Sequence, residues 1–180
     1  MNSILIAPHD DDFTLFAALT CMREKPLIVL VTDAYIQYNR GEIGCDKETR
    51  AKETLESAKI LGCSVVRLGI RDDICNEPAI IEKLRNFQGF DRVYAPALQG
   101  GNKDHDMVSN AAKAVFGALV TYYTTYTPSQ LYTTGTQEIV GTPEEIELKN
   151  SALQCFQSQI NLPATKPHFR AIAGKPEWYI

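Results

Sequence analysis

Short runs dominated by apolar and β-branched residues alternate along this chain with longer segments in which apolar residues recur every three or four positions. The short runs have the length of strands buried on both faces and occur at 4–6, 27–32, 64–68 and 92–95. Helical spacing is found at 13–19, 46–61, 78–87, 104–115 and 142–157. Segments rich in Thr, Tyr and Val predict further strands at 119–126 and 132–140.

This alternation predicts an α/β fold of Rossmann-like type, in which a mostly parallel sheet carries helices on both faces. No internal repeat or linker divides the sequence, so residues 1–180 are expected to form a single domain.

Several helix ends are marked by residues that suit them. Asp46 is expected to cap the start of the second helix and Gly62 to follow its end. The run Thr142-Pro143-Glu144-Glu145 has the pattern of a capping box with proline at the first helical position. Asp104 or Asp106 is expected to cap the fourth helix. The proline-containing tail from residue 161 onward is expected to be irregular.

The charge balance and the length of the apolar runs exclude several classes of protein. A formal net charge of −4, without a long basic run, argues against a nucleic-acid backbone as the partner. No stretch approaches the ~20 apolar residues that a membrane helix needs, and the chain starts directly on a strand, so we expect a cytoplasmic protein. Both the G-x-G-x-x-G and the P-loop sequences are absent, which leaves nucleotide binding through those loops unsupported.

His9, Asp10, Asp11 and Asp12 follow the first predicted strand, at a strand-to-helix turn where open α/β folds bind ligands. Three adjacent carboxylates repel one another, so their charge must be compensated. One explanation is the helix, because an N-cap aspartate bonds free backbone N–H groups and the helix dipole favours its charge. The other is a cation held by His9 and Asp12, ligand types that suit zinc, with Asp11 left free as a base. This run alone leaves both explanations open.

A second histidine favours the metal explanation. His105 follows the loop after the fourth predicted strand, and in a doubly wound sheet His9 and His105 both lie at the carboxyl edge. We therefore expect a metal site made by His9, Asp12 and His105. The third histidine, His168, lies in the tail and is expected to be structural or exposed. Four tyrosines, at 122, 123, 126 and 132, are expected to pack within the sheet rather than against a sugar.

The run Ala7 to Asp12 resembles the A-H-P-D-D-E signature of the LmbE/PIG-L-like deacetylases, with the family histidine at His9 and its two aspartates at Asp11 and Asp12. Other stretches resemble family segments in the same order along nearly the whole chain. They are Val31-Thr32-Asp33-Ala34, Arg50 with Glu53, Ala58 and Leu61-Gly62, Leu68-Gly69 with Asp72, Asn102-Lys103-Asp104-His105, and Lys149 with Ser158-Gln159.

The resemblance implies a zinc-dependent hydrolase that removes an N-acetyl group from an N-acetylglucosamine-type sugar or conjugate. The cofactor would be Zn²⁺ or another divalent metal, and the partner a small amino-sugar substrate; self-association into a homo-oligomer is left open. The residues that match the family's functional positions are His9, Asp12 and His105 as metal ligands, Asp11 as general base, and Arg50 and Asp72 as substrate-binding residues. For Arg50 an exposed helix pair with Glu53 is the alternative, and for Asp72 a polar turn.

Three positions depart from the family pattern. Asp10 replaces a proline and adds a charge near the expected metal, and Phe13 replaces a glutamate. Asn102 replaces the first histidine of H-P-D-H; an asparagine can donate a hydrogen bond to an oxyanion but transfers no proton at neutral pH. Two alternatives therefore remain beside the deacetylase: a related small-molecule amidase, and a catalytically weak, metal-holding, sugar-binding protein.

Overall fold

The computed structural model describes residues 2–33, 46–71 and 73–180. Within these ranges seven strands form one sheet in the order β3-β2-β1-β4-β5-β7-β6, and β1 to β5 pair in parallel while β7 runs antiparallel to β5 and β6. The expected α/β fold with a mostly parallel sheet is therefore confirmed. The strands are β1 (Ser3–Ala7), β2 (Leu27–Thr32), β3 (Ser64–Ile70), β4 (Arg92–Pro96), β5 (Val120–Tyr123), β6 (Gln137–Ile139) and β7 (Glu177–Tyr179).

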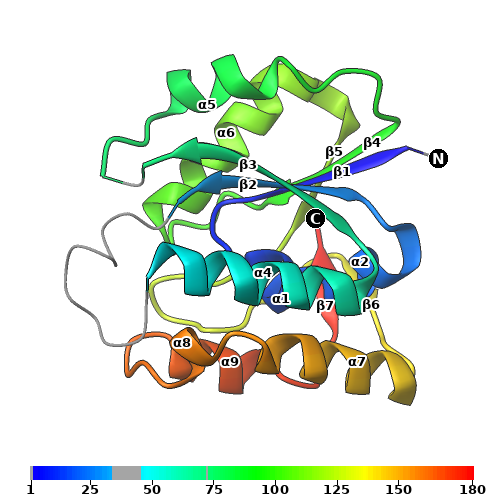
Figure 1. Ribbon diagram of the computed structural model, residues 1–180. Helices are drawn as coiled ribbons and strands as arrows, with labels where there is room; N and C mark the ends of the chain where they lie inside the picture. The colour runs from blue at the N-terminus through cyan, green and yellow to red at the C-terminus, as the bar shows by residue number, and fades with distance from the viewer. Residues whose placement is uncertain (1, 34–45, 72) are drawn as a thin grey trace.

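Helices cover both faces of the sheet, as expected (Figure 1). α5 (Glu77–Leu84) and α6 (Lys103–Phe116) lie on one face, over a core that includes Ile4 and Ile6 of β1. The opposite face of β1, with Leu5 and Ala7, packs in a second core with α1 and α4. This alternation follows from the two-residue period of a strand. The helices on this second side are α1 (Asp12–Phe16), α2 (Ala18–Glu24), α4 (Lys47–Leu61), α7 (Pro143–Gln154), α8 (Gln157–Ile160) and α9 (Lys166–Ile172).

β1 lies at the point where the strand order reverses. Ile4 pairs with Leu27 of β2 on one side and with Val93 of β4 on the other, both in parallel. The carboxyl ends of β1 and β4 therefore lie side by side, which is where open α/β sheets bind ligands. The segments that leave these two ends carry His9 and His105, so the topology alone brings them to one place.

Most of the capping residues predicted for the helix ends are confirmed. Asp46 Oδ1 accepts a hydrogen bond from the Thr49 N–H (2.7 Å), Gly62 has a left-handed φ of 75°, and the capping box of Thr142 and Glu145 is formed. The expected cap of α6 is wrong: Asn102, not Asp104 or Asp106, is the N-cap, and its Oδ1 accepts from the Asp104 N–H at 2.8 Å. The predicted helix at 13–19 is two helices, α1 and α2.

The expectation of an irregular tail is wrong. The tail forms α9 and β7, and its apolar residues Phe169 and Ile172 are buried in the core on the α1 and α4 side. Pro167 does not prevent the helix because it lies in the first turn of α9, where its missing N–H needs no partner. β7 is held by an ion pair between Lys149 and Glu177 (2.9 Å), both fully buried.

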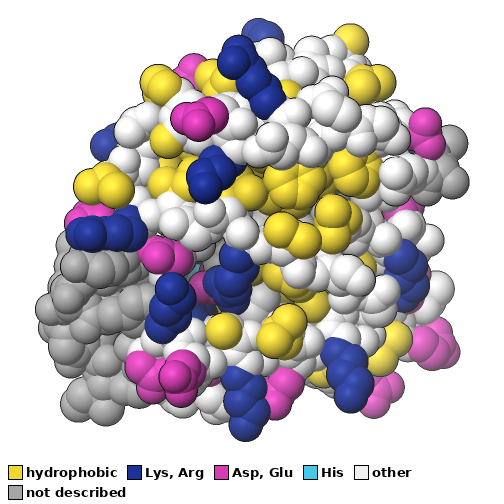
Figure 2. All heavy atoms as spheres, turned by 45° about the horizontal axis from the view of Figure 1, so that its top comes forward, with side chains coloured by type: hydrophobic (Ala, Val, Ile, Leu, Met, Phe, Trp, Pro, Cys, Tyr) yellow, Lys and Arg dark blue, Asp and Glu magenta, His cyan; other side chains and the backbone are white. Residues whose placement is uncertain are grey.

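None of the described helices is both long and apolar enough to cross a membrane. Acidic and basic side chains are intermixed over the face of the molecule that Figure 2 shows, which matches the modest net charge of −4.

Candidate metal centre and active site

The turn after β1 fixes the first part of the site. The Pro8 carbonyl accepts hydrogen bonds from the Thr32 N–H (3.0 Å) and the Thr32 hydroxyl (2.8 Å), which tie the turn to the end of β2. The His9 N–H then donates to Asp12 Oδ2 at 2.8 Å, so the Asp12 carboxylate bends back toward the end of the strand. These bonds hold His9 and Asp12 in a fixed relation before any ion binds.

Three potential ligands meet at this turn. His9 Nδ1 lies 3.0 Å from Asp12 Oδ2, and His105 Nε2 lies 3.3 Å from Asp12 Oδ1. One ligand atom from each of the three residues lies within 4.8 Å of the others, and Asp12 and His105 are buried. The structure therefore brings together the three residues that the sequence suggested as metal ligands.

The hydrogen bonds around His105 indicate which of its nitrogens faces the site as a lone pair. The Thr125 hydroxyl lies 3.3 Å from both Gln99 Oε1 and His105 Nδ1; when it donates to Gln99, it accepts a hydrogen bond from His105 Nδ1. With the proton on Nδ1, Nε2 is unprotonated, and it is a buried atom without a hydrogen-bond partner among the described residues. A lone pair beside the Asp12 carboxylate fits a bound cation, and a second bond to the other ring nitrogen is the usual support of a histidine ligand.

Asp104 orients the other histidine. Asp104 Oδ2 lies 3.0 Å from His9 Nε2, while His9 Nδ1 faces Asp12. Burial alone would lower the pKa of His9, but the two carboxylates raise it well above its usual value. Burial alone would raise the pKa of Asp12, and the two histidines that face it, His105 first and then His9, lower it instead. Asp12 therefore stays an anion between two imidazoles, as a cation-binding carboxylate must.

Asp11 occupies the N-cap position of α1, but its side chain makes no capping hydrogen bond. Helix capping therefore does not explain this carboxylate. Asp11 lines a cavity of about 190 Å³ and its Oδ1 lies 3.8 Å from Arg50 Nη2. Burial raises the pKa of Asp11 and the Arg50 guanidinium partly offsets this rise. A buried carboxylate of raised pKa beside a metal-binding group has the properties of a general base.

The charge of Asp10 is neutralised away from the cavity. Asp10 is fully buried; its Oδ1 lies 2.5 Å from Arg67 Nη2 and accepts a hydrogen bond from the Thr54 hydroxyl at 2.9 Å. Arg50 Nε lies 3.7 Å from its other oxygen. The charge that Asp10 adds at this turn is therefore compensated, because α4 and β3 provide its counter-charges.

Arg50 and Glu53 are not an exposed helix pair. Arg50 is 2% exposed and Glu53 6% exposed, and Arg50 Nη1 lies 3.6 Å from Glu53 Oε2. Glu53 also accepts hydrogen bonds from the N–H (2.7 Å) and the hydroxyl (2.6 Å) of Ser158, which fixes α8 against α4. Arg50 lines the cavity. Asp72, the other expected substrate-binding residue, lies outside the described residues.

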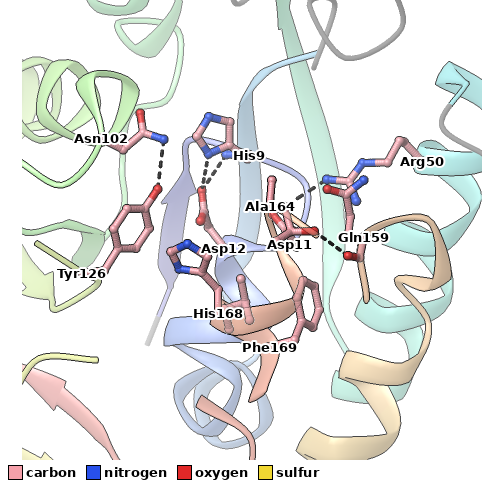
Figure 3. A pocket seen from close by; sticks show the side chains of 12 residues that line it. His9, Asp11, Asp12, Arg50, Asn102, Tyr126, Gln159, Ala164, His168 and Phe169 are labelled. Atoms are coloured by element: carbon pink, nitrogen blue, oxygen red, sulfur yellow. Dashed lines mark hydrogen bonds and ion pairs between the residues drawn. The ribbon is translucent and has the colours of Figure 1, made fainter. Parts of the chain in front are cut away.

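Two further side chains line the cavity although they were not expected there, Tyr126 and His168. Asn102 Nδ2 donates to the Tyr126 hydroxyl at 3.0 Å, and the ring of His168 lies 4.7 Å from the ring of Tyr126. Figure 3 shows Asn102 and Tyr126 on one side of the cavity, Arg50 and Gln159 on the other, and His9, Asp12 and His168 between them. The expectation that Tyr126 packs within the sheet is wrong, since Tyr126 follows β5 and lines the cavity, as does His168.

The signals for these two residues in the sequence were weak. Tyr126 follows a strand rich in Thr, Tyr and Val and looks like part of it. His168 lies beyond the segments that resemble the family, in a tail whose prolines predicted an irregular structure where the helix α9 forms. Burial lowers the pKa of His168, and the nearby charge of Asp12 opposes this effect.

A scan against protein families matches residues 4–116 to the PIG-L model, described as GlcNAc-PI de-N-acetylase. The chain belongs to the PIG-L family. The matched PIG-L region contains His9, Asp12, Asn102 and His105, and it ends before Tyr126 and His168. A search of curated proteins finds no match to the sequence.

Solved structures resemble this PIG-L family member over its whole length. The A40926 pseudoaglycone deacetylase Dbv21 has a TM-score of 0.76 and 15% identity, with 99% of this chain and 97% of that chain covered. The zinc-inhibited form of the teicoplanin deacetylase Orf2 has a TM-score of 0.74 and 13% identity over 99% and 97% of the two chains. The 4-carboxy-2-hydroxymuconate hydratase GalB from Pseudomonas putida KT2440 has a TM-score of 0.73 and 15% identity over 99% and 95%. At these identities the comparisons support the fold.

Proposed function

We propose that this protein is a divalent-metal-dependent hydrolase that removes the N-acetyl group from an N-acetylglucosamine-type sugar or conjugate. The observation that carries the proposal is the group of His9, Asp12 and His105 beside a buried Asp11 at the cavity, in a member of the PIG-L family. Two structural neighbours are deacetylases, which supports the same reaction class. We further propose that residues 1–180 act as one domain on a small cytoplasmic substrate.

His9, Asp12 and His105 would hold the ion. Two imidazole nitrogens and one carboxylate oxygen suit Zn²⁺, and three protein ligands leave room for a further one, as in hydrolytic sites. When bound, such an ion polarises the amide carbonyl and acidifies water, which are the two demands of amide hydrolysis.

Asp11 is the general base. Its carboxylate lines the cavity, makes no capping bond, and lies one residue before Asp12 in the chain, so the two neighbours face different partners. Asp11 accepts the proton of the attacking water, and its raised pKa makes it a stronger base than a free aspartate. Arg50, 3.8 Å away, holds the base in position, and because it lines the cavity it also contacts the substrate. Asp72 stays a proposed substrate contact.

Asn102 and Tyr126 together supply the hydrogen bond to the oxyanion. Both polar atoms of the Asn102 side chain are hydrogen-bonded: Oδ1 caps α6, and Nδ2 donates to the Tyr126 oxygen. The Tyr126 hydroxyl therefore keeps its own proton for a partner in the cavity, and burial raises its pKa further above neutrality so that it stays protonated. A donor held in place before the reaction stabilises developing negative charge at little reorganisation cost.

Asn102 also supports a second candidate. A protein that holds a metal and binds a sugar, without turnover, needs no proton donor at this position, and Asn102 offers none. A related small-molecule amidase is a third candidate, because the same metal and base hydrolyse any amide that fits the cavity.

One assay tests the proposal and separates the candidates. Zinc-loaded protein is incubated with N-acetylglucosamine, N-acetylglucosaminyl-phosphatidylinositol and other simple N-acetyl amides, and released amine and acetate are measured. We expect equal amounts of both from a sugar substrate, a loss of ~10²-fold or more in Asp11→Asn, and no loss in the control Asp73→Asn, which changes an exposed aspartate. Sugar binding without release of acetate would favour the binding protein, and release only from amides without a sugar would favour the amidase.

A further inference from the structure

His168 has a ring nitrogen that no described residue satisfies. Nδ1 is buried and has no hydrogen-bond partner among residues 2–33, 46–71 and 73–180. Buried polar atoms in proteins are nearly always paired, so an unpaired one needs a specific explanation, such as a catalytic role or a bound water or ion. His168 lines the same cavity as His9, Asp11 and Asp12.

The side chains beside His168 fix its ring but transfer no proton at neutral pH. Its ring packs at 4.7 Å from the ring of Tyr126, and the backbone of α9 is anchored through the buried Phe169 next to it. Tyr126 keeps its proton because burial raises its pKa, and Asn102 is an amide. Imidazole, in contrast, exchanges a proton near neutral pH, and because burial lowers the pKa of His168 its protonated ring gives up a proton more readily than a free imidazolium.

We propose, on the basis of the proposed deacetylation, that His168 gives a proton to the nitrogen of the departing amine. An amine is a poor leaving group unless it is protonated as the bond to carbon breaks, so the reaction needs such a donor. His168 fills the gap left by Asn102 from a different element of the fold, the helix α9 of the tail.

The step balances in atoms and charge. Water adds through its oxygen to the carbonyl carbon, and Asp11 takes one proton of that water. The tetrahedral carbon then releases nitrogen: the C–N bond breaks, its electron pair goes to nitrogen, and the imidazolium of His168 supplies the proton that completes the amine. Acetic acid and amine leave, and the acid gives its remaining proton to the amine or to solvent water. Exchange with solvent then returns one proton to His168 and removes one from Asp11.

Two variants of the full, zinc-loaded chain test this role with a sugar amide that the wild type hydrolyses. His168→Gln keeps the size and an N–H donor but transfers no proton, and His168→Ala makes room for added imidazole. We expect kcat to fall by ~10²-fold or more in both, with KM, zinc content and melting temperature close to wild type. Imidazole in the buffer should raise kcat of His168→Ala at least tenfold and leave the wild type unchanged. The matched control is Arg170→Gln, an exposed residue of the same helix.

Other results overturn the inference. If His168→Gln keeps kcat within threefold of wild type, a hydrogen bond at most is involved and no proton is transferred. A loss in His168→Ala that imidazole does not reduce, or one that accompanies a loss of zinc, contradicts it equally. These outcomes leave the proposed deacetylation intact, whereas a wild-type protein that releases no amine from any amide overturns the proposed function and this inference with it.

Discussion

Removing the ammonium group of Lys149 is expected to destabilise the fold strongly. Lys149 Nζ lies 2.9 Å from Glu177 Oε1, and the two side chains are 0% and 1% exposed. In Lys149→Met the Glu177 carboxylate keeps the Leu19 N–H at 2.9 Å but loses its counter-charge in the interior. Breaking a buried pair from one side costs about 3–5 kcal/mol, a large part of the ~5–15 kcal/mol that stabilises a typical domain.

Thermal unfolding followed by circular dichroism measures this cost. A loss of about 3–5 kcal/mol corresponds to a fall in Tm of roughly 6–20 °C, at ~2–4 °C per kcal/mol for a chain of this size. Glu177→Gln keeps an acceptor for Leu19, so the double variant Lys149→Met with Glu177→Gln leaves no unpaired charge. We therefore expect the double variant to be more stable than the sum of the two single losses predicts.

The pair between Arg23 and Glu145 is the matched control, since the Arg23 side chain is 42% exposed. Removing an exposed pair costs at most about 1 kcal/mol. Two results would show that the buried pair does not hold β7 as described. One is a loss of unfolding free energy in Lys149→Met no larger than in the control; the other is a loss in the double variant equal to the sum of the losses in the two single variants.

Three further predictions concern the site and the surface. Asp11→Asn should retain zinc and the fold yet lose most hydrolysis, whereas Asp12→Asn should weaken zinc binding first; zinc titration with a deacetylation assay would reveal reversed roles. Asn102→Ala should lower kcat by ~10²-fold through loss of the oxyanion donor that it positions, and an unchanged kcat would remove Asn102 from the mechanism. The Arg23 hydrogen bond lowers the pKa of Glu145 from 4.5 to about 2, so this carboxylate stabilises the fold above pH 4.5 and loses that effect as the pH falls toward 2. The difference in unfolding free energy between wild type and Glu145→Gln, about 1 kcal/mol or less at pH 7, should therefore vanish near pH 2. A difference that persists at pH 2 would contradict the expectation that the ionised carboxylate is the stabilising form.

The parts of the fold that follow local rules could be predicted from the sequence. Short apolar runs located β1 to β4, the Thr, Tyr and Val content located β5, and helical spacing located most helices. Asp46, Gly62 and Thr142 marked helix ends through local hydrogen bonds. The grouping of His9 and His105 followed from topology, because both come after parallel strands that end at one edge.

The rest depended on contacts between distant segments. The tail looked irregular because of its prolines, which break helices in most positions. Burial of Phe169 and Ile172 of α9 in the core depends on distant parts of the chain, so no local pattern predicts it. Tyr126 and His168 are 42 residues apart in the numbering, and nothing local predicts that their rings meet. The neutralisation of Asp10 by Arg67 likewise joins the β1 turn to β3.

The most direct test of the account measures zinc binding and amine release on the same samples. Protein treated with a chelator is titrated with Zn²⁺, and the amine released from an N-acetylglucosamine conjugate is followed at each addition. We predict no release from the treated protein, a rise in proportion to bound zinc, and saturation at about one zinc per chain, with His105→Ala failing to bind or to recover. Full activity without metal, or zinc binding and hydrolysis unaffected in His105→Ala, would contradict the assignment of His9, Asp12 and His105 as the centre of the site.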